Sequence, residues 1–241
     1  GSALGFGRKS CELDRTIRFG RLSGTHAEGQ AIARMLGVQP YLGANATEGR
    51  LKLARSPRIL HLATHGFFLE DQDPDATPSQ DVPSMFNHPE KLKDPMLRSG
   101  LALAGANSFL QGRRTPCEAE DGILTAADVA GLDLLDTELV VLSACETALG
   151  GVEIGEGVFG LRRSFVAAGA RTLIMSMWKV PDLQTQQLME DFYTRLLSGE
   201  PKAEALRNAQ LAIKMRCPHP FFWGAFICQG DPGPLVKRLS G

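Results

Sequence analysis

The sequence predicts an α/β domain in which a mostly parallel sheet carries helices on both faces. Short apolar runs of strand length alternate with segments whose apolar residues recur every three or four positions. Because helical segments separate most of the successive strands, those strands are expected to pair in parallel. The pattern continues almost to the end of the chain, so we expect a single domain over residues 3–241, with Gly1 and Ser2 interpreted as the remnant of an expression tag.

The N-terminal part of the chain supplies two strands and two helices. In order, we expect a strand at 3–6, a helix at 27–36, a short helix between Thr47 and Pro57, and a buried strand at 58–63. Thr25 and Glu28 have the spacing of a capping box, in which the threonine caps the helix and the glutamate reaches back to it. Gly37 can end the same helix, because glycine readily adopts the left-handed conformation of a C-cap.

Two long exposed loops are expected in the middle of the chain. Residues 70–95 are rich in Asp and Pro, and neither this segment nor residues 105–121 shows the apolar periodicity of a helix or strand. Residues 97–104, between the two loops, regain apolar character. Thr125 and Asp128 form a second capping pair, at the start of a short helix over 123–129.

The remainder of the chain again alternates strands and helices. We expect strands at 138–144, 172–178 and 221–227, and helices at 158–168, 183–198 and 201–213. Gly169 and Gly199 can end the first two of these helices, and Pro201 suits the first turn of the third.

The composition argues against several classes of function. Lys and Arg together number 26 and Asp and Glu 27, so a net charge of -1 gives no reason to expect nucleic acid or an anionic membrane as a partner. No apolar run approaches the roughly 20 residues of a membrane-spanning helix. The first residues also lack the features of a signal peptide, which makes the cytoplasm the expected location.

The cysteines do not predict a disulfide framework or a metal site. Their number is five, with no CxxC pair, which fits a reducing compartment. Cys217, His219 and Cys228 match no zinc-binding spacing, and prolines on both sides of His219 favour a rigid loop. Residues 155–160 match GxGxxG, but about ten residues separate them from the preceding strand, whereas a dinucleotide fingerprint follows its strand directly. We therefore expect no cofactor.

Two reactive side chains follow two of the expected buried strands. His65 lies just past the strand at 58–63, and Cys145 just past the strand at 138–144. Chemistry collects at the carboxyl ends of strands in open α/β sheets, so neighbouring strands would bring the imidazole and the thiol together. Histidine can take the thiol proton and return it to a leaving amine. The backbone N–H groups of Gly66 and Cys145 can then form an oxyanion hole.

A structural interpretation of the same residues stays open. Free cysteine is among the most buried residue types, so Cys145 can be an ordinary core residue. The other histidines are weaker catalytic candidates. His61 lies within the strand and is expected to pack in the core or against a helix, His26 lies in a first helical turn, and His88 and His219 lie in proline-rich loops.

These motifs resemble those of CHAT domains, the caspase-like and separase-like peptidases that are often fused to tetratricopeptide repeats. Residues 59–66, ILHLATHG, resemble the histidine motif, and residues 139–147, LVVLSACET, resemble the cysteine motif. The similarity continues through 98–107, 121–126, 155–157, 168–171 and 178–182. The resemblance implies a caspase-like three-layer sandwich with His65 as general base and acid and Cys145 as the nucleophile of a Cys-His dyad.

The resemblance also bears on substrate binding. Ser143 occupies the position of a glutamine in caspases and an aspartate in metacaspases, and without a charge it cannot select a charged side chain. Trp178 and Asp182 belong to a segment similar to one in separases, whose pocket accepts arginine. Asp182 either selects a basic residue or caps the helix that starts near 183. Glu146 either orients loops or touches substrate.

The predicted function is therefore that of a cysteine endopeptidase, a hydrolase that would be the effector domain of a larger, regulated bacterial protein. Its expected partners are a protein or peptide substrate and a regulatory repeat domain in the same chain or an activating protein, with no nucleic acid and no membrane. A catalytically silent, caspase-like signalling or partner-binding module remains the alternative. Hydrolysis of some other amide or ester is a third, weaker interpretation.

Overall fold

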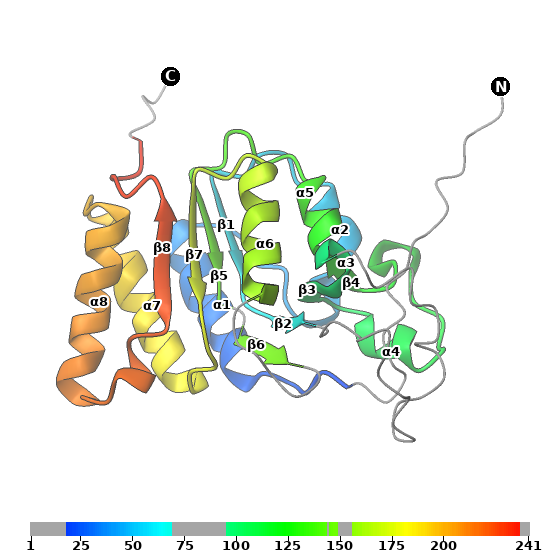
Figure 1. The fold of residues 1–241 in the computed structure, drawn as a ribbon, viewed down its shortest axis with the longest axis horizontal. Helices are drawn as coiled ribbons and strands as arrows, with labels where there is room; N and C mark the ends of the chain where they lie inside the picture. The colour runs from blue at the N-terminus through cyan, green and yellow to red at the C-terminus, as the bar shows by residue number, and fades with distance from the viewer. Residues whose placement is uncertain (1–17, 69–94, 144, 149–155, 237–241) are drawn as a thin grey trace.

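The computed structural model describes residues 18–68, 95–143, 145–148 and 156–236 (Figure 1). The strand expected at 3–6 and nearly all of the loop expected at 70–95 lie outside these ranges. None of the helices within them is long and apolar enough to cross a membrane.

The larger of the two sheets carries the strands that the sequence predicts most clearly. Its four strands, in the order β1-β5-β7-β8, are β1 (Ile59–Leu62), β5 (Leu139–Leu142), β7 (Thr172–Ser176) and β8 (Phe226–Gly230). The first three are parallel and β8 pairs antiparallel with β7. The structure is thus a mixed α/β fold with a mostly parallel main sheet. The expected strand at 221–227 begins late, because Pro220–Phe222 forms a 3-10 turn, η4.

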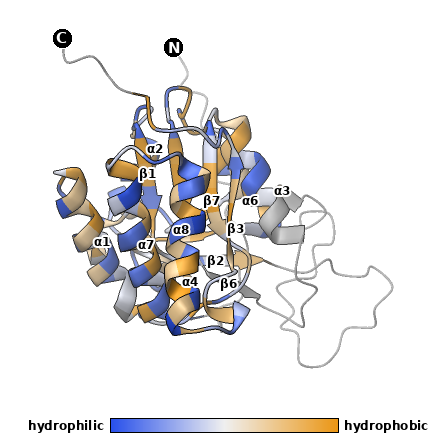
Figure 2. Cartoon of the chain, turned by 90° about the vertical axis from the view of Figure 1, so that its left-hand side faces the viewer, coloured by the Kyte–Doolittle hydropathy of each residue, from blue (hydrophilic) through white to orange (hydrophobic). Residues whose placement is uncertain are grey.

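Helices cover both faces of the main sheet (Figure 1). Helices α1 (Ser23–Leu36), α7 (Asp182–Leu197) and α8 (Lys202–Arg216) pack on one face, and α5 (Ala126–Ala130) and α6 (Glu156–Ala167) on the other. Residues of β5 alternate between the two cores, since Leu139 and Val141 face α7 whereas Val140 and Leu142 face α6. Hydrophilic and hydrophobic residues alternate along α1, α7 and α8 (Figure 2), and Ile32, Leu188 and Ala205 are among the residues of these helices that are buried in one core.

A second, smaller sheet follows the carboxyl ends of β1 and β5, where only strand ends were expected. Its order is β4-β3-β2-β6, formed by β4 (Ile123–Thr125), β3 (Ser99–Ala102), β2 (His65–Phe68) and β6 (Cys145–Ala148). Close packing of β3 between β4 and β2 requires glycine at position 100, because a Cβ atom there would lie 2.5 Å from the Leu124 carbonyl oxygen of β4 and 2.7 Å from the Phe67 ring of β2.

The prediction of a loop over residues 105–121 is wrong in part. It contains a short helix, α4 (Ala106–Leu110), and a 3-10 turn, η3 (Cys117–Ala119). Ala106, Leu110 and Ala119 are buried, so this segment contributes to a core of its own beside Phe67. A one-turn apolar spacing is too short to stand out from the polar residues around it. Two other short helices are α2 (Glu48–Lys52) and α3 (Pro95–Arg98), and residues 43–45 form the turn η1.

The two expected capping boxes have different outcomes. Thr125 and Asp128 form theirs, although residues 123–125 are a strand and α5 begins at Ala126. Thr25 and Glu28 do not, because α1 starts earlier, at Ser23, and Thr25 Oγ1 instead donates to the Leu22 carbonyl, 2.9 Å away. Gly37 ends α1 in the left-handed conformation, with φ at 67°, as expected.

Candidate functional site

The backbone brings His65 and Cys145 to adjacent positions. Strands β1 and β5 are parallel neighbours, and the chain passes from each of them into β2 and β6, which pair in parallel as well. In that pairing His65 is aligned with Cys145 and Gly66 with Glu146. Neighbouring strands lie about 4.8 Å apart, so the two backbone positions are at contact distance. For residues 145–148 the structure describes the backbone course alone.

The His65 ring is held by the segment that precedes α1. Its Nε2 lies 2.6 Å from the carbonyl oxygen of Gly20, and the ring of Phe19 packs against it with centroids 5.6 Å apart. A carbonyl oxygen only accepts, so Nε2 carries a proton and donates it. In the neutral ring Nδ1 is therefore the nitrogen that can accept a proton.

Asn107 of α4 fixes the backbone that holds His65. Its Oδ1 accepts from the Phe19 N–H at 2.9 Å, and its Nδ2 donates to the Phe19 carbonyl at 2.8 Å. This two-point clamp fixes the residue next to Gly20, and through it the orientation of the His65 ring. Sequence reasoning missed Asn107 as a functional residue, since nothing local indicates a contact with a segment 88 positions away.

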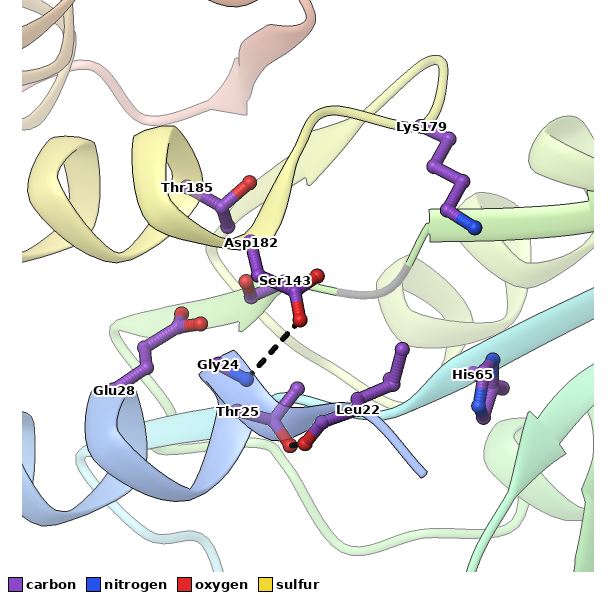
Figure 3. Close-up of a pocket in the computed structure, with 9 residues that line it drawn as sticks. All are labelled: Leu22, Gly24, Thr25, Glu28, His65, Ser143, Lys179, Asp182 and Thr185. Carbon is purple, nitrogen blue, oxygen red and sulfur yellow. Dashed lines mark hydrogen bonds between the residues drawn. The ribbon is translucent and has the colours of Figure 1, made fainter. Parts of the chain in front are cut away.

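A small pocket opens beside His65 at the carboxyl edge of the main sheet (Figure 3). Its volume is about 20 Å³, enough for about one water molecule. It brings together three of the expected site residues, His65, Ser143 and Asp182. The other lining residues come from the start of α1, the loop after β7 and the first turn of α7, namely Leu22, Gly24, Thr25, Glu28, Lys179 and Thr185.

Asp182 both lines this pocket and caps a helix, but not the helix that was expected. One carboxylate oxygen accepts from the Gly24 N–H at 3.1 Å, which caps α1 (Figure 3). Helix α7 begins at Asp182 itself and has no side-chain cap. Gly24 is required at this approach, because a Cβ atom would lie 2.5 Å from the Cβ of Asp182.

Five oxygen-bearing side chains line the pocket, those of Thr25, Glu28, Ser143, Asp182 and Thr185. Ser143 and Thr185 are 5% and 6% exposed, and their hydroxyl oxygens have no hydrogen-bond partner among the described residues. Glu28 is 2% exposed and Asp182 is half-buried. With two carboxylates and one cationic residue, Lys179, the lining favours a cationic or hydrogen-donating group in the pocket.

The comparison with protein families identifies the domain. The CHAT domain model matches residues 2–231. This chain belongs to the CHAT domain family. Among curated proteins it is similar to Tetratricopeptide repeat protein 28 of Homo sapiens, with 29% identity over 240 residues, and to the protein of the same name of Mus musculus, with 28% identity. Each alignment covers 96% of this chain and 9% of the relative, so this chain matches about a tenth of the length of those proteins.

His61, the first of the two histidines in the CHAT histidine motif at residues 59–66, has a different environment from His65. His61 Nε2 lies 3.1 Å from Glu28 Oε1, and Nδ1 lies 3.1 Å from the Tyr193 hydroxyl, so the ring links α1 and α7 to β1. The core position expected for His61 is confirmed. Burial raises the pKa of Tyr193 well above its usual value, and the Glu28 carboxylate adds to this shift, so the hydroxyl stays protonated.

Trp178 lies next to the His65 pocket of the CHAT domain without lining it. Its Nε1 donates to the Phe221 carbonyl at 3.1 Å. It lines a separate, open hollow with Lys179, Pro181, His219 and Phe221, and Lys179 is common to both. Gly66 is buried at the second position of β2, between Leu101 of β3 and Glu146 of β6.

The described part of the CHAT domain offers no cluster of three side chains suited to a metal ion. His219 Nδ1 accepts from the Phe221 N–H at 3.2 Å, at the start of η4. Cys117, Cys217 and Cys228 are free thiols, and burial raises the pKa of Cys228.

Proposed function

We propose that this CHAT domain is a cysteine endopeptidase that cleaves a protein substrate with a dyad of His65 and Cys145, in a caspase-like three-layer sandwich. One observation carries the proposal. The histidine and the cysteine are aligned in register on adjacent parallel strands, at the carboxyl edge of the main sheet. Chemistry is expected at that edge in α/β folds.

The proposed reaction uses the tautomer of His65 that the Gly20 carbonyl favours. With Nε2 donating to that carbonyl, Nδ1 takes the proton of the Cys145 thiol, and the thiolate attacks the peptide carbonyl carbon. The N–H groups of Gly66 and Cys145 stabilise the oxyanion of the tetrahedral intermediate. His65 then returns the proton to the leaving amine, and water hydrolyses the thioester by the same steps. The mechanism needs no metal and no cofactor.

The proposed specificity is for a basic residue before the scissile bond. The pocket beside His65 has the carboxylates of Glu28 and Asp182 in its lining, and Ser143 contributes no charge. A lysine or arginine side chain needs more room than about 20 Å³, so we expect Leu22 to shift when substrate binds. Trp178, in the adjoining hollow, is proposed to contact a neighbouring substrate residue, and Glu146 to touch substrate or orient the loops around it.

We also propose that the domain acts within a larger, regulated protein in the cytoplasm. Both curated relatives are tetratricopeptide repeat proteins in which the matching region is 9% of the length. A repeat region in the same chain, or an activating protein, would then control access to the site.

A catalytically silent module is the second candidate. The small volume of the pocket favours it, since in this form no substrate side chain larger than a water molecule fits beside His65. The domain would then bind a partner without cleaving it.

Cleavage of a diverse peptide library by the full-length protein separates the two candidates. Endopeptidase function predicts cleavage after Arg or Lys that disappears in Cys145→Ala and persists with a chelator. The matched control is Cys217→Ala, which removes a thiol distant in sequence and should leave turnover unchanged. Cleavage that survives in Cys145→Ala would rule out the proposed nucleophile, and a full-length protein that binds partners yet cleaves nothing would favour the silent module.

A further inference from the structure

The segment between α4 and η3 presents two adjacent basic side chains to solvent. Arg113 and Arg114 are both exposed. Residues 113–116 form neither helix nor strand, and Pro116 has the extended conformation, with φ at -56° and ψ at 147°. Exposed loops of this kind are the preferred sites of proteolytic cleavage.

Few backbone contacts hold this segment. The N–H of Arg113 donates to the Ser108 carbonyl at 2.9 Å, but the peptide group between Arg114 and Thr115 has no backbone hydrogen bond to another described residue. One side-chain contact follows, from the Thr115 hydroxyl to the Glu120 carbonyl. The segment can therefore open locally at a small cost in free energy.

Both ends of the segment are anchored in the core. Leu110 at the end of α4 and Ala119 in η3 are each 3% exposed. Ile123 of β4 shares a core with Leu110, and β4 pairs antiparallel with β3. Cleavage between these anchors would leave the two parts of the domain joined by buried contacts.

Two other groups of arginines in the described structure are less accessible to a peptidase. The adjacent pair Arg162–Arg163 lies within α6, where the helix bonds would have to break first. Arg18 and Arg21 are exposed but flank the Gly20 carbonyl that holds the His65 ring. Removal of that stretch from its place would dismantle the candidate active site. The segment at 113–116 has neither restriction.

We propose that one copy of this CHAT domain cleaves a second copy after Arg114. The proposal rests on the peptidase function proposed above, because the pocket beside His65 has to take the arginine side chain. Glu28 and Asp182 line that pocket, and their carboxylates complement a guanidinium in charge and in hydrogen bonding.

The cleavage is a hydrolysis and needs no reactant except water. The Cys145 thiolate forms a bond to the carbonyl carbon of Arg114, and the C–N bond to Thr115 breaks. The nitrogen leaves as the amine of Thr115 with the proton that His65 took from the thiol. Water then hydrolyses the thioester, so that Arg114 ends in a carboxylate and Cys145 recovers its thiol.

Incubation of a tagged Cys145→Ala chain with the untagged wild type tests the proposal. Intact mass and N-terminal sequencing should identify a cut between Arg114 and Thr115, and the cut should disappear when the wild type is first alkylated with iodoacetamide. A cut in the Cys145→Ala chain incubated alone would overturn the proposal, because another nucleophile would then be responsible.

A peptide library added to the same samples separates this proposal from the proposed function. Cleavage of the library after Arg or Lys, with the Arg114–Thr115 bond intact, would overturn self-cleavage and leave the peptidase function standing. No cleavage of the library or of the chain would overturn both.

Variants of the Cys145→Ala chain test the choice of site. Arg113→Gln/Arg114→Gln should slow the cut by at least about tenfold, the effect of losing a charge-assisted contact. The matched control, Arg207→Gln/Arg216→Gln, removes two exposed arginines of α8 and should leave the rate unchanged. Equal rates in the two variants would contradict the assignment of Arg114.

Limited digestion with trypsin tests the accessibility of the segment without the domain's own activity. Trypsin should cut the Arg114–Thr115 bond before the Arg163–Ser164 bond of α6, because a loop opens more easily than a packed helix. The reverse order would overturn the proposal.

Discussion

Two histidines four positions apart, His61 and His65, have opposite environments in this CHAT domain. His61 lies in β1 with a side chain 10% exposed, and both ring nitrogens have partners, Glu28 and Tyr193. His65 opens β2, and its one hydrogen-bond partner among the described residues is the Gly20 carbonyl, on Nε2. The first ring joins three elements of the core, whereas Nδ1 of the second ring has no hydrogen-bond partner among the described residues.

The comparison shows that a carboxylate beside a histidine does not identify a catalytic base. The pair of Glu28 and His61 has the contacts of an acid–base site, but Tyr193 occupies the second nitrogen and the core surrounds the ring. His65 has no carboxylate partner in the described structure, and a backbone carbonyl orients it instead. His65 is the better candidate for catalysis, because its Nδ1 has no hydrogen-bond partner within the described residues and Cys145 is aligned with it in register.

The largest expected effect comes from the proposed dyad. Cys145→Ala should lower kcat/KM by more than about 10⁴-fold, because the nucleophile is lost. His65→Ala should lower it by about 10²- to 10⁴-fold, the usual contribution of a general base. Steady-state kinetics on a cleavable peptide measures both. A His65→Ala protein that retains wild-type kcat would remove His65 from the mechanism.

The second-largest effect is expected from the charge of Asp182, on cleavage after basic residues. Asp182→Asn keeps an oxygen that can accept from the Gly24 N–H, so α1 stays capped while the charge is lost. Cleavage after Arg or Lys should fall by about 10- to 100-fold, as for a charge-assisted contact of about 1.5–3 kcal/mol, and cleavage after neutral residues should not change. Asp182→Ala removes the cap too and should also lower stability by about 1 kcal/mol. Equal losses for basic and neutral substrates would assign Asp182 a capping role alone.

Asn107 should have a smaller effect through the orientation of His65. Asn107→Ala removes both contacts with Phe19. We expect kcat to fall by about tenfold, which corresponds to the loss of about one net hydrogen bond, with little change in KM. Asn107→Asp retains the acceptor for the Phe19 N–H and should recover part of the loss. A change in KM alone would indicate that Asn107 serves substrate binding and not the position of the ring.

The His61 network should affect stability and leave chemistry almost unchanged. Tyr193→Phe deletes a buried hydroxyl and leaves His61 Nδ1 without that partner, at a cost of about 1–3 kcal/mol in the free energy of unfolding. Turnover per folded molecule should stay within about twofold of the wild type. Denaturant unfolding and kinetics on the same samples separate the two effects, and a large loss of kcat would show that His61 takes part in catalysis after all.

The same contrast explains what the sequence could predict. Strands β1, β5 and β7 and helix α7 are continuous segments whose apolar periodicity is visible locally, and the expected parallel pairing of β1 with β5 is confirmed. The positions of His65 and Cys145 at strand ends were predictable for the same reason. The small sheet was not, because β2 and β6 continue past expected strand ends and β3 pairs with β2 only where Gly100 permits close contact.

Contacts between distant segments also escaped prediction. Glu28 was assigned to a local capping box, yet it pairs with His61, 33 positions away. Gly20 holds His65 from 45 positions away. Asp182 caps α1 through the N–H of Gly24, from which it is separated by 158 positions. Local patterns carry no information on such pairs, which only the folded chain brings together.

The pH dependence of alkylation at Cys145 tests the central claim most directly. Iodoacetamide labelling is followed by mass spectrometry of the peptide that contains Cys145, in the wild type and in His65→Ala, with Cys217 as the internal reference. We predict that Cys145 of the wild type reacts at pH values at least roughly one unit below the ordinary thiol pKa of about 8.5, and that His65→Ala restores the ordinary profile. Identical profiles at Cys145 in the two proteins would contradict a His65–Cys145 dyad.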